Sequence, residues 1–181
     1  TIGEVKEKIH GINEEILERI FGDRFTPEER RQIAWEKEAT YREIFLPDLK
    51  LISGLPAFLN HIRATGLPMA IGTAAPPENA EFVVKHLDLR DYFSGVFHAK
   101  SVSKGKPDPE IFEKAAASME LPVADCLIFE DSVTGAEAAH RAGAQSVIVT
   151  TTHSKDEFAK YDNILRFIDD YRGLTLDTLT S

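Results

Sequence analysis

The sequence predicts a doubly wound α/β fold of the Rossmann-like kind: a parallel sheet covered by helices on both faces, preceded by a small helical domain. From about residue 49 onward, short apolar segments alternate with amphipathic helical segments. Such alternation gives a parallel sheet through right-handed crossovers. Before that point, apolar residues recur only at helical spacing. We therefore expect a helical domain over residues 1–48 and an α/β core over residues 49–181.

The helical domain is predicted from spacing and from signals for helix starts. Thr26 is followed by proline and two glutamates, which is typical of a helix start, so a helix should run from there toward Phe45. Trp35, Tyr41 and Phe45, spaced along this helix, are expected in a core rather than on a surface that stacks against a ligand. An earlier helical stretch, interrupted near Gly11, is predicted from apolar residues three or four positions apart: Val5, Ile9, Ile12, Ile16, Leu17 and Ile20.

The α/β core is predicted to begin with a helix from Gly54 to Thr65, which Gly66 ends. The apolar segments expected as strands lie at residues 68–73, 95–99, 126–129, 146–150 and 164–168. The helices expected between them cover residues 78–87, 109–119 and 134–142. The strands are short and almost wholly apolar, which is typical of a parallel sheet buried on both faces.

Composition restricts the classes of function. The 181 residues carry a net charge of −9, which disfavours nucleic acid and anionic membranes as partners because both attract clustered Lys and Arg. No apolar run approaches the roughly 20 residues of a membrane span, and no segment resembles a signal peptide. Cys126 is the only cysteine, so no internal disulfide can form. We expect a cytoplasmic monomer that acts on a small molecule.

Polar residues at the carboxyl ends of the predicted strands are the candidates for chemistry, because open parallel sheets bind ligands at that edge. The segment Gly-Thr-Ala-Ala places the Thr73 hydroxyl and the Ala74 N–H at a turn, where they can hold a phosphate. The alternative is that Thr73 only forms the turn. Lys106 lies in the next such loop, which two prolines stiffen. The alternative there is a surface turn with solvated lysines.

A pair of adjacent carboxylates, Glu130 and Asp131, ends the strand predicted at 126–129. Mg²⁺ prefers oxygen ligands, so this pair suits a magnesium ion. The alternative is that Asp131 or Ser132 caps the following helix. A hydroxyl, a lysine and a carboxylate pair at successive strand ends together match the needs of phosphoryl transfer.

The three segments resemble motifs two, three and four of the haloacid dehalogenase superfamily, and within it the β-phosphoglucomutase-like phosphatases. They read Gly-Thr-Ala-Ala, Lys-Gly-Lys-Pro-Asp-Pro-Glu-Ile-Phe and Ile-Phe-Glu-Asp-Ser-Val-Thr-Gly. The resemblance implies that Thr73 and the Ala74 N–H bind the transferring phosphoryl group and that Lys106 stabilises its charge. It also implies that Glu130 and Asp131 hold Mg²⁺.

The resemblance has one departure: the first motif of the family, Asp-x-Asp-Gly, is absent from the chain. In the family this motif supplies the nucleophile and the general acid, on a strand that lies between the strands of motifs two and four. Without that strand two interior edges lack partners, at about 1–3 kcal/mol for each buried orphan group. We therefore expect the natural protein to begin before Thr1, and this chain alone to be inactive.

The helical domain resembles the family's cap, in which a loop contacts the leaving group. The resemblance places His10, Asn13 and Glu14 in that loop, although Asn13 and Glu14 are also suited to a helix N-terminus. An acidic group there disfavours a second substrate phosphate. The chain is thus expected to be a Mg²⁺-dependent hydrolase of small phosphomonoesters such as sugar phosphates, acting through an aspartyl phosphate. A β-phosphoglucomutase-type isomerase and a non-catalytic remnant that binds phosphorylated ligands are the alternatives.

Overall fold

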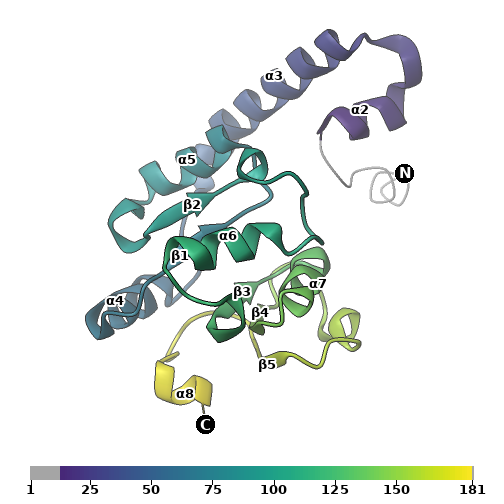
Figure 1. Cartoon of the computed structure of the whole chain (residues 1–181). Helices are drawn as coiled ribbons and strands as arrows, with labels where there is room; N and C mark the ends of the chain where they lie inside the picture. Colours follow the sequence, from purple (N-terminus) through teal and green to yellow (C-terminus); the bar gives the residue numbers. More distant parts are fainter. Residues whose placement is uncertain (1–12, 181) are drawn as a thin grey trace. The chain divides into compact units, whose positions relative to one another are not determined.

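The computed structural model describes residues 13–180, and the chain divides into two compact units, Thr1–Leu49 and Lys50–Ser181. In the first unit, α2 (Asn13–Phe21) and α3 (Pro27–Phe45) are joined by a turn of 3-10 helix, η1 (Gly22–Arg24), and followed by another, η2 (Leu46–Asp48) (Figure 1). The helix predicted before residue 13 lies outside the described residues.

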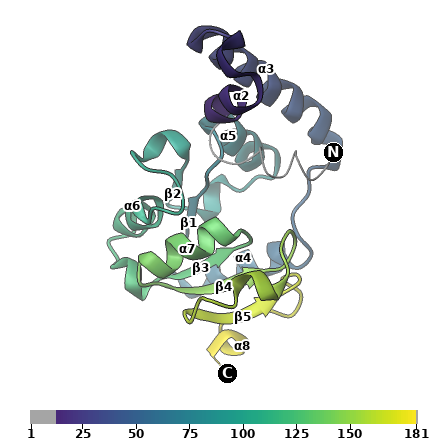
Figure 2. The ribbon, with the colours of Figure 1, turned by 90° about the vertical axis from the view of Figure 1, so that its right-hand side faces the viewer.

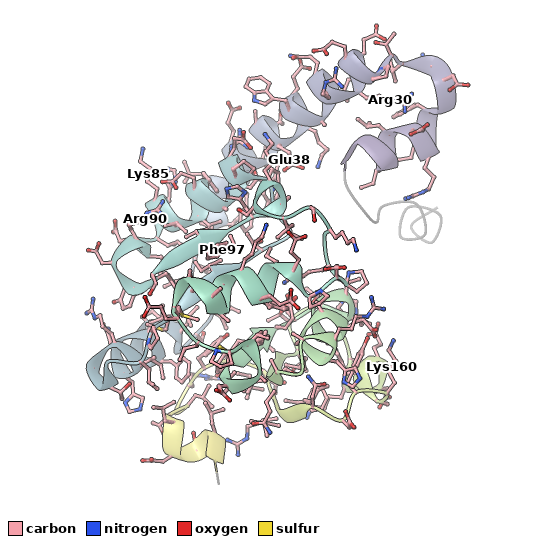
Figure 3. The ribbon with its side chains drawn as sticks, in the orientation of Figure 1. Arg30, Glu38, Lys85, Arg90, Phe97 and Lys160 are labelled. Atoms are coloured by element: carbon pink, nitrogen blue, oxygen red, sulfur yellow. The ribbon has the colours of Figure 1, made fainter. Side chains whose placement is uncertain are left out.

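The start of α3 confirms the predicted capping signal. The Thr26 N–H donates to the Glu29 carboxylate at 2.8 Å, and the Thr26 hydroxyl accepts from the Glu29 N–H, so each residue satisfies a donor of the other. Arg30, labelled in Figure 3, joins the two helices through an ion pair with Glu18 at 3.1 Å.

Two aromatic residues of α3 are more exposed than the sequence suggested. Trp35 is 57% exposed and Tyr41 is 47% exposed, so the prediction that they lie in a core is wrong. The physical reason is that two packed helices bury only the faces that they turn toward each other, and α3 has no fully buried residue.

The second unit contains all the strands and helices that the sequence predicted for the core, together with α8, which was not predicted. Its strands are β1 (Ala70–Gly72), β2 (Gly95–Phe97), β3 (Leu127–Glu130), β4 (Gln145–Val149) and β5 (Ile164–Ile168). Its α-helices are α4 (Leu55–Thr65), α5 (Pro77–His86), α6 (Glu110–Ser118), α7 (Val133–Arg141) and α8 (Leu176–Thr180). Four 3-10 helices connect them: η3 (Arg90–Tyr92), η4 (Ala99–Ser101), η5 (Val123–Asp125) and η6 (Lys155–Phe158).

The strands form two parallel sheets rather than the single sheet predicted. β1 pairs with β2, and β3 pairs with β4, which pairs with β5. The strands lie in the spatial order β2, β1, β3, β4, β5 (Figure 2). Among the described residues no hydrogen-bonded pairing joins β1 to β3, and the predicted sheet is therefore divided at that point.

An apolar cavity of about 510 Å³ lies at the division between the sheets. All three residues of β1 line it, as do Leu127–Phe129 of β3 and the rings of Phe58, Phe112 and Tyr171. The edges of β1 and β3 that lack a partner strand within residues 13–180 are the edges that face each other in this order of strands.

Helices on both faces hold the two sheets side by side. On one face, α4 places Phe58 in a core cluster with Val147 of β4, and Leu59 in another cluster that includes Ile71 of β1. On the opposite face, Ile111 of α6 shares a cluster with Ile128 of β3 and with small residues of α7. The carboxyl ends of all five strands are thus positioned by side-chain packing across the division as well as by the two ladders.

We expect Gly54→Ala to lower the free energy of unfolding by about 2–5 kcal/mol. Gly54 has φ of +83°, and a Cβ there would lie 2.3 Å from the backbone nitrogen of Arg172. Backbone strain of about 1–2 kcal/mol adds to an overlap worth about 1–3 kcal/mol. Gly66→Ala is the matched control, since its φ is +77° but nothing lies within 4 Å of an added Cβ. Urea unfolding measures both, and equal losses would contradict the close approach at Gly54.

Candidate active site

A nearly buried ion pair joins the loop before α6 to the end of β3. The Lys106 ammonium donates to Oε1 of Glu130 at 2.8 Å, and the two side chains are only 8% and 9% exposed. The ammonium also lies 4.6 Å from the centre of the Phe112 ring, which adds a cation–π contact. Lys106 is therefore not the solvated lysine of a surface turn, whereas Lys104 in the same loop is 74% exposed.

The carboxylate of Glu130 is enclosed by donors. Oε1 accepts from the Ser132 hydroxyl at 3.1 Å in addition to Lys106, and Oε2 accepts from the Asp131 N–H at 3.0 Å. Ser132 is the N-cap of α7, because its hydroxyl accepts from the Gly135 N–H at 3.0 Å. Ser132 therefore caps α7, and the Asp131 carboxylate takes no part in the cap.

Asp131 lies at the same edge, one residue past β3. The Thr152 hydroxyl, in the loop after β4, lies 3.3 Å from Oδ2 of Asp131 and 3.1 Å from its carbonyl oxygen. Sequence reasoning did not select Thr152, because a threonine in a loop carries no pattern of its own. The contact ties the loop after β4 to the loop after β3.

Thr73 occupies the turn that follows β1. Its N–H donates to the carbonyl of Phe97 at 2.8 Å, which extends the pairing of β1 with β2 by one residue. Its hydroxyl accepts from the Ala75 N–H at 3.1 Å, so Thr73 does form the turn. A hydroxyl that accepts one bond still has its own proton to donate, and the turn geometry leaves a phosphate-binding role open.

The ring of Phe112 connects the Thr73 turn with Lys106. An added Cβ at Gly72, the residue before Thr73, would lie 3.3 Å from this ring, and the Lys106 ammonium lies over the same ring. Phe97, labelled in Figure 3, pairs with Gly72 across the β1–β2 ladder and packs against the cluster that contains Phe112. The structure therefore brings the ends of β1 and β3 and the Lys106 loop to one edge of the unit.

The candidates of the helical domain are not tested by the structure. His10 lies outside the described residues. Asn13 and Glu14 form the first turn of α2, and their side chains also lie outside the description. The assignment of these three residues to the substrate stays a prediction.

The oxygen donors at the strand ends fit a magnesium ion. Among residues 13–180, no three His, Cys, Asp or Glu side chains converge on one point. Glu130 and Asp131 are adjacent, however, and Mg²⁺ is commonly held by one or two carboxylates, with waters and substrate phosphate oxygens completing the shell. The chemistry of this pair is thus compatible with the ion that the sequence suggested.

Tyr171, in the loop after β5, is a further residue near this edge that the sequence did not single out. Burial raises the pKa of its phenol to about 12, and the negative charges of Asp131 and Glu130 act in the same direction. Its ring packs against Phe58 and Phe129 at centroid distances of 5.5 and 5.7 Å. No sequence motif marks this position, since its role arises from packing between distant segments.

Comparisons with known proteins give the family. The family model described as haloacid dehalogenase-like hydrolase matches residues 3–143. The chain therefore belongs to the family of haloacid dehalogenase-like hydrolases. Within residues 13–180, the chain contains no helix with the length and apolar character needed to cross a membrane.

Relatives of the chain include phosphatases and phosphoglucomutases. A chloroplastic 5-amino-6-(5-phospho-D-ribitylamino)uracil phosphatase of Arabidopsis thaliana is 28% identical over 95% of this chain and 46% of its own length. The β-phosphoglucomutase of Bacillus subtilis is 31% identical over 80% of this chain and 66% of its own length. The chain thus spans about half to two thirds of these relatives. Their names support the predicted class of enzyme.

Solved structures share the fold. The crystal structure of a family IA, variant 3 haloacid dehalogenase hydrolase from Entamoeba histolytica matches with a TM-score of 0.88 at 23% identity, over 99% of this chain and 82% of that one. At this identity the likeness concerns the fold alone. It confirms the predicted fold class, in which the described strands form two sheets.

We expect Gly135→Ala to break the Lys106–Glu130 pair. A Cβ at Gly135 would lie 1.4 Å from Oε1 of Glu130, so the carboxylate would have to leave its position. Losing one partner of a buried pair costs about 3–5 kcal/mol, which urea unfolding can measure. Gly105→Ala, with nothing within 4 Å of its Cβ, is the control, in the loop that carries Lys106. A Gly135→Ala protein as stable as the control would contradict the assigned position of Glu130.

The raised pKa of Tyr171 predicts a loss of stability in alkali. The unfolded chain, with a tyrosine pKa near 10, ionises first, so the folded state binds more protons and stability falls as the pH rises from about 10 to about 12. The slope is about 1 kcal/mol per pH unit from this residue. In the Tyr171→Phe protein, the free energy of unfolding should fall less steeply over that pH range. Urea unfolding in the presence of EDTA measures it. Equal slopes in the two proteins would contradict the shift.

Proposed function

We propose that this chain is the phosphate- and metal-binding part of a Mg²⁺-dependent hydrolase of small phosphomonoesters, with sugar phosphates as the expected substrates. The main observation is the nearly buried Lys106–Glu130 pair next to Asp131, at the edge where the Thr73 turn also lies. A fixed ammonium in a site of low dielectric stabilises charge that develops on a transferring phosphoryl group. Family membership and the phosphatase relatives support the same conclusion.

Each residue has a proposed role. Thr73 and the Ala74 N–H bind phosphoryl oxygens, and Lys106 offsets their negative charge. Asp131 is the direct magnesium ligand that we favour, because the oxygens of Glu130 already accept three hydrogen bonds. When bound, Mg²⁺ supplies electrostatic stabilisation of the phosphate and orients it.

The nucleophile is proposed to be an aspartate on a strand that this chain does not contain. Its carboxylate oxygen attacks phosphorus, the phosphorus–oxygen bond to the alcohol breaks, and a general acid protonates the leaving oxygen; water then hydrolyses the aspartyl phosphate. This proposal is supported by the facing edges of β1 and β3, which have no partner strand in the described part of the chain, and by the apolar cavity between them. The 181-residue chain by itself is accordingly expected to be inactive.

Two other functions are distinguished by experiment. A β-phosphoglucomutase-type isomerase, which the Bacillus subtilis relative favours, would interconvert glucose 1- and 6-phosphates without net phosphate release. A non-catalytic remnant would bind phosphate without turnover. We further propose a cytoplasmic monomer with a small phosphorylated metabolite as its partner, consistent with the single cysteine and the negative charge.

The product of the complete reading frame that contains this chain is expected to release phosphate from p-nitrophenyl phosphate in the presence of Mg²⁺. Lys106→Ala and Asp131→Ala should each lower this rate by about 100-fold or more, the usual loss when one group that stabilises transition-state charge is removed. The rate of p-nitrophenol formation with Mg²⁺ and with EDTA is the measurement.

A lysine and an aspartate of the same unit that lie away from the candidate site provide matched controls. Lys85→Ala removes an exposed ammonium on α5 (Figure 3), and Asp125→Ala removes an exposed carboxylate at the opposite end of β3. Both should retain wild-type rates. Wild-type rates in Lys106→Ala and Asp131→Ala would refute the site, and formation of glucose 6-phosphate from glucose 1-phosphate without phosphate release would favour the isomerase.

A further inference from the structure

The loop that presents Lys106 is held by one carboxylate of the following helix. Oε2 of Glu110, in the first turn of α6, accepts from the Ser103 N–H at 2.8 Å, the Ser103 hydroxyl at 2.7 Å and the Lys104 N–H at 2.9 Å. These donors belong to the two residues that lead into Gly105 and Lys106. A side chain, rather than a backbone ladder, therefore satisfies the amides of this stretch.

A second set of contacts fixes Glu110 itself. Its Oε1 pairs with the Lys114 ammonium at 2.7 Å, one helical turn along α6, and this ammonium also donates to the Ser101 carbonyl at 2.8 Å. The Glu110 N–H donates to Oδ1 of Asp108 at 3.1 Å. The bond to Lys114, followed by those from Ser103 and Lys104, lowers the pKa of Glu110 to about 2. Glu110 thus stays ionised and bound to the loop at neutral pH.

Lys106 needs such support because its side chain must be ordered in a nearly buried position. Fixing a lysine side chain costs rotamer entropy, and its ammonium has to reach Glu130 across the edge of the unit. After Lys106, a proline and the turn from the Asp108 N–H to the Gly105 carbonyl restrict the chain. Before Lys106, the restriction comes from Glu110.

We propose that Glu110 is a positioning residue that holds the chain before Lys106, so that the Lys106 ammonium meets Glu130 and, given the proposed function, the transferring phosphoryl group. Glu110 acts through Lys106 and is not assigned a contact with substrate. Glu113 is a matched control, since it is an exposed carboxylate in the first turn of the same helix.

The first experiment measures the reactivity of the Lys106 amine and does not depend on catalysis. The folded chain is treated with acetic anhydride, and acetylation of each lysine is followed by peptide mass spectrometry. Glu110→Ala should raise the rate at Lys106 by about five-fold or more, because three hydrogen bonds that hold the loop are lost. Glu110→Gln, whose amide oxygen can still accept from the loop, should stay within about two-fold of wild type, and Glu113→Ala should equal it.

Reactivity of the Cys126 thiol toward a disulfide reagent distinguishes local release of the loop from general loosening. Cys126 precedes β3 at the end opposite to Glu130 and is partly buried, so its rate should not change in Glu110→Ala. Unchanged acetylation of Lys106 in Glu110→Ala would overturn the proposal. A parallel rise in the modification rate of Cys126 in Glu110→Ala would also overturn it. The same holds if Lys106 is acetylated as fast in Glu110→Gln as in Glu110→Ala.

The second experiment uses the active product of the complete reading frame. Glu110→Ala should lower kcat about ten-fold, and it should cause no further loss in a Lys106→Ala background, because the two residues act in series. Additive losses would overturn the link to Lys106. If the wild-type protein releases no phosphate, the proposed function fails, while the acetylation rates still decide the role of Glu110.

Discussion

The ion pair between Lys106 and Glu130 is the constraint on which the arrangement of the site depends. Two charges taken out of water each lose several kcal/mol of hydration free energy. A buried ion pair is therefore stable only where other interactions compensate for that loss. Here the ring of Phe112, the hydroxyl of Ser132 and the N–H of Asp131 all point at the pair. The start of α7, the first turns of α6 and the end of β3 are thereby fixed relative to one another.

The balance of charge at this edge explains why a divalent cation suits it. One ammonium, Lys106, faces two carboxylates, Glu130 and Asp131, so these three side chains sum to one negative charge. A phosphate dianion would be repelled by that sum. A divalent ion held by Asp131, as proposed above, would reverse the sign and make the same edge attractive to phosphate, which is the balance that phosphoryl transfer requires.

Much of the core could be predicted from the sequence because its signals are local. Helix and strand periods, the capping residues at Thr26 and the glycine after α4 each involve neighbours along the chain. The site residues Thr73, Lys106, Glu130 and Asp131 were selected because strand ends and a family resemblance pointed to them. The structure places these four residues at one edge of the unit, and their roles stay predictions.

What could not be predicted depends on residues far apart in the sequence. The pairing of Lys106 with Glu130 spans 24 positions, and the charges around Tyr171 come from a different strand. The division of the sheet likewise depends on which strands meet in space. The exposure of Trp35 is decided by how few elements pack on α3, which no local pattern records.

The division between β1 and β3 also determines how rigid the site is. Neighbouring strands in a ladder are kept about 4.8 Å apart by their main-chain bonds, but the described residues contribute no such bonds across this boundary. The separation of the Thr73 turn from Asp131 is set instead by the packing of Phe58, Phe112 and the helices that carry them. The spacing between the Thr73 turn and Asp131 therefore follows the volumes of the side chains packed between the two sheets, and a change in one of those volumes would shift the two halves of the candidate site relative to each other.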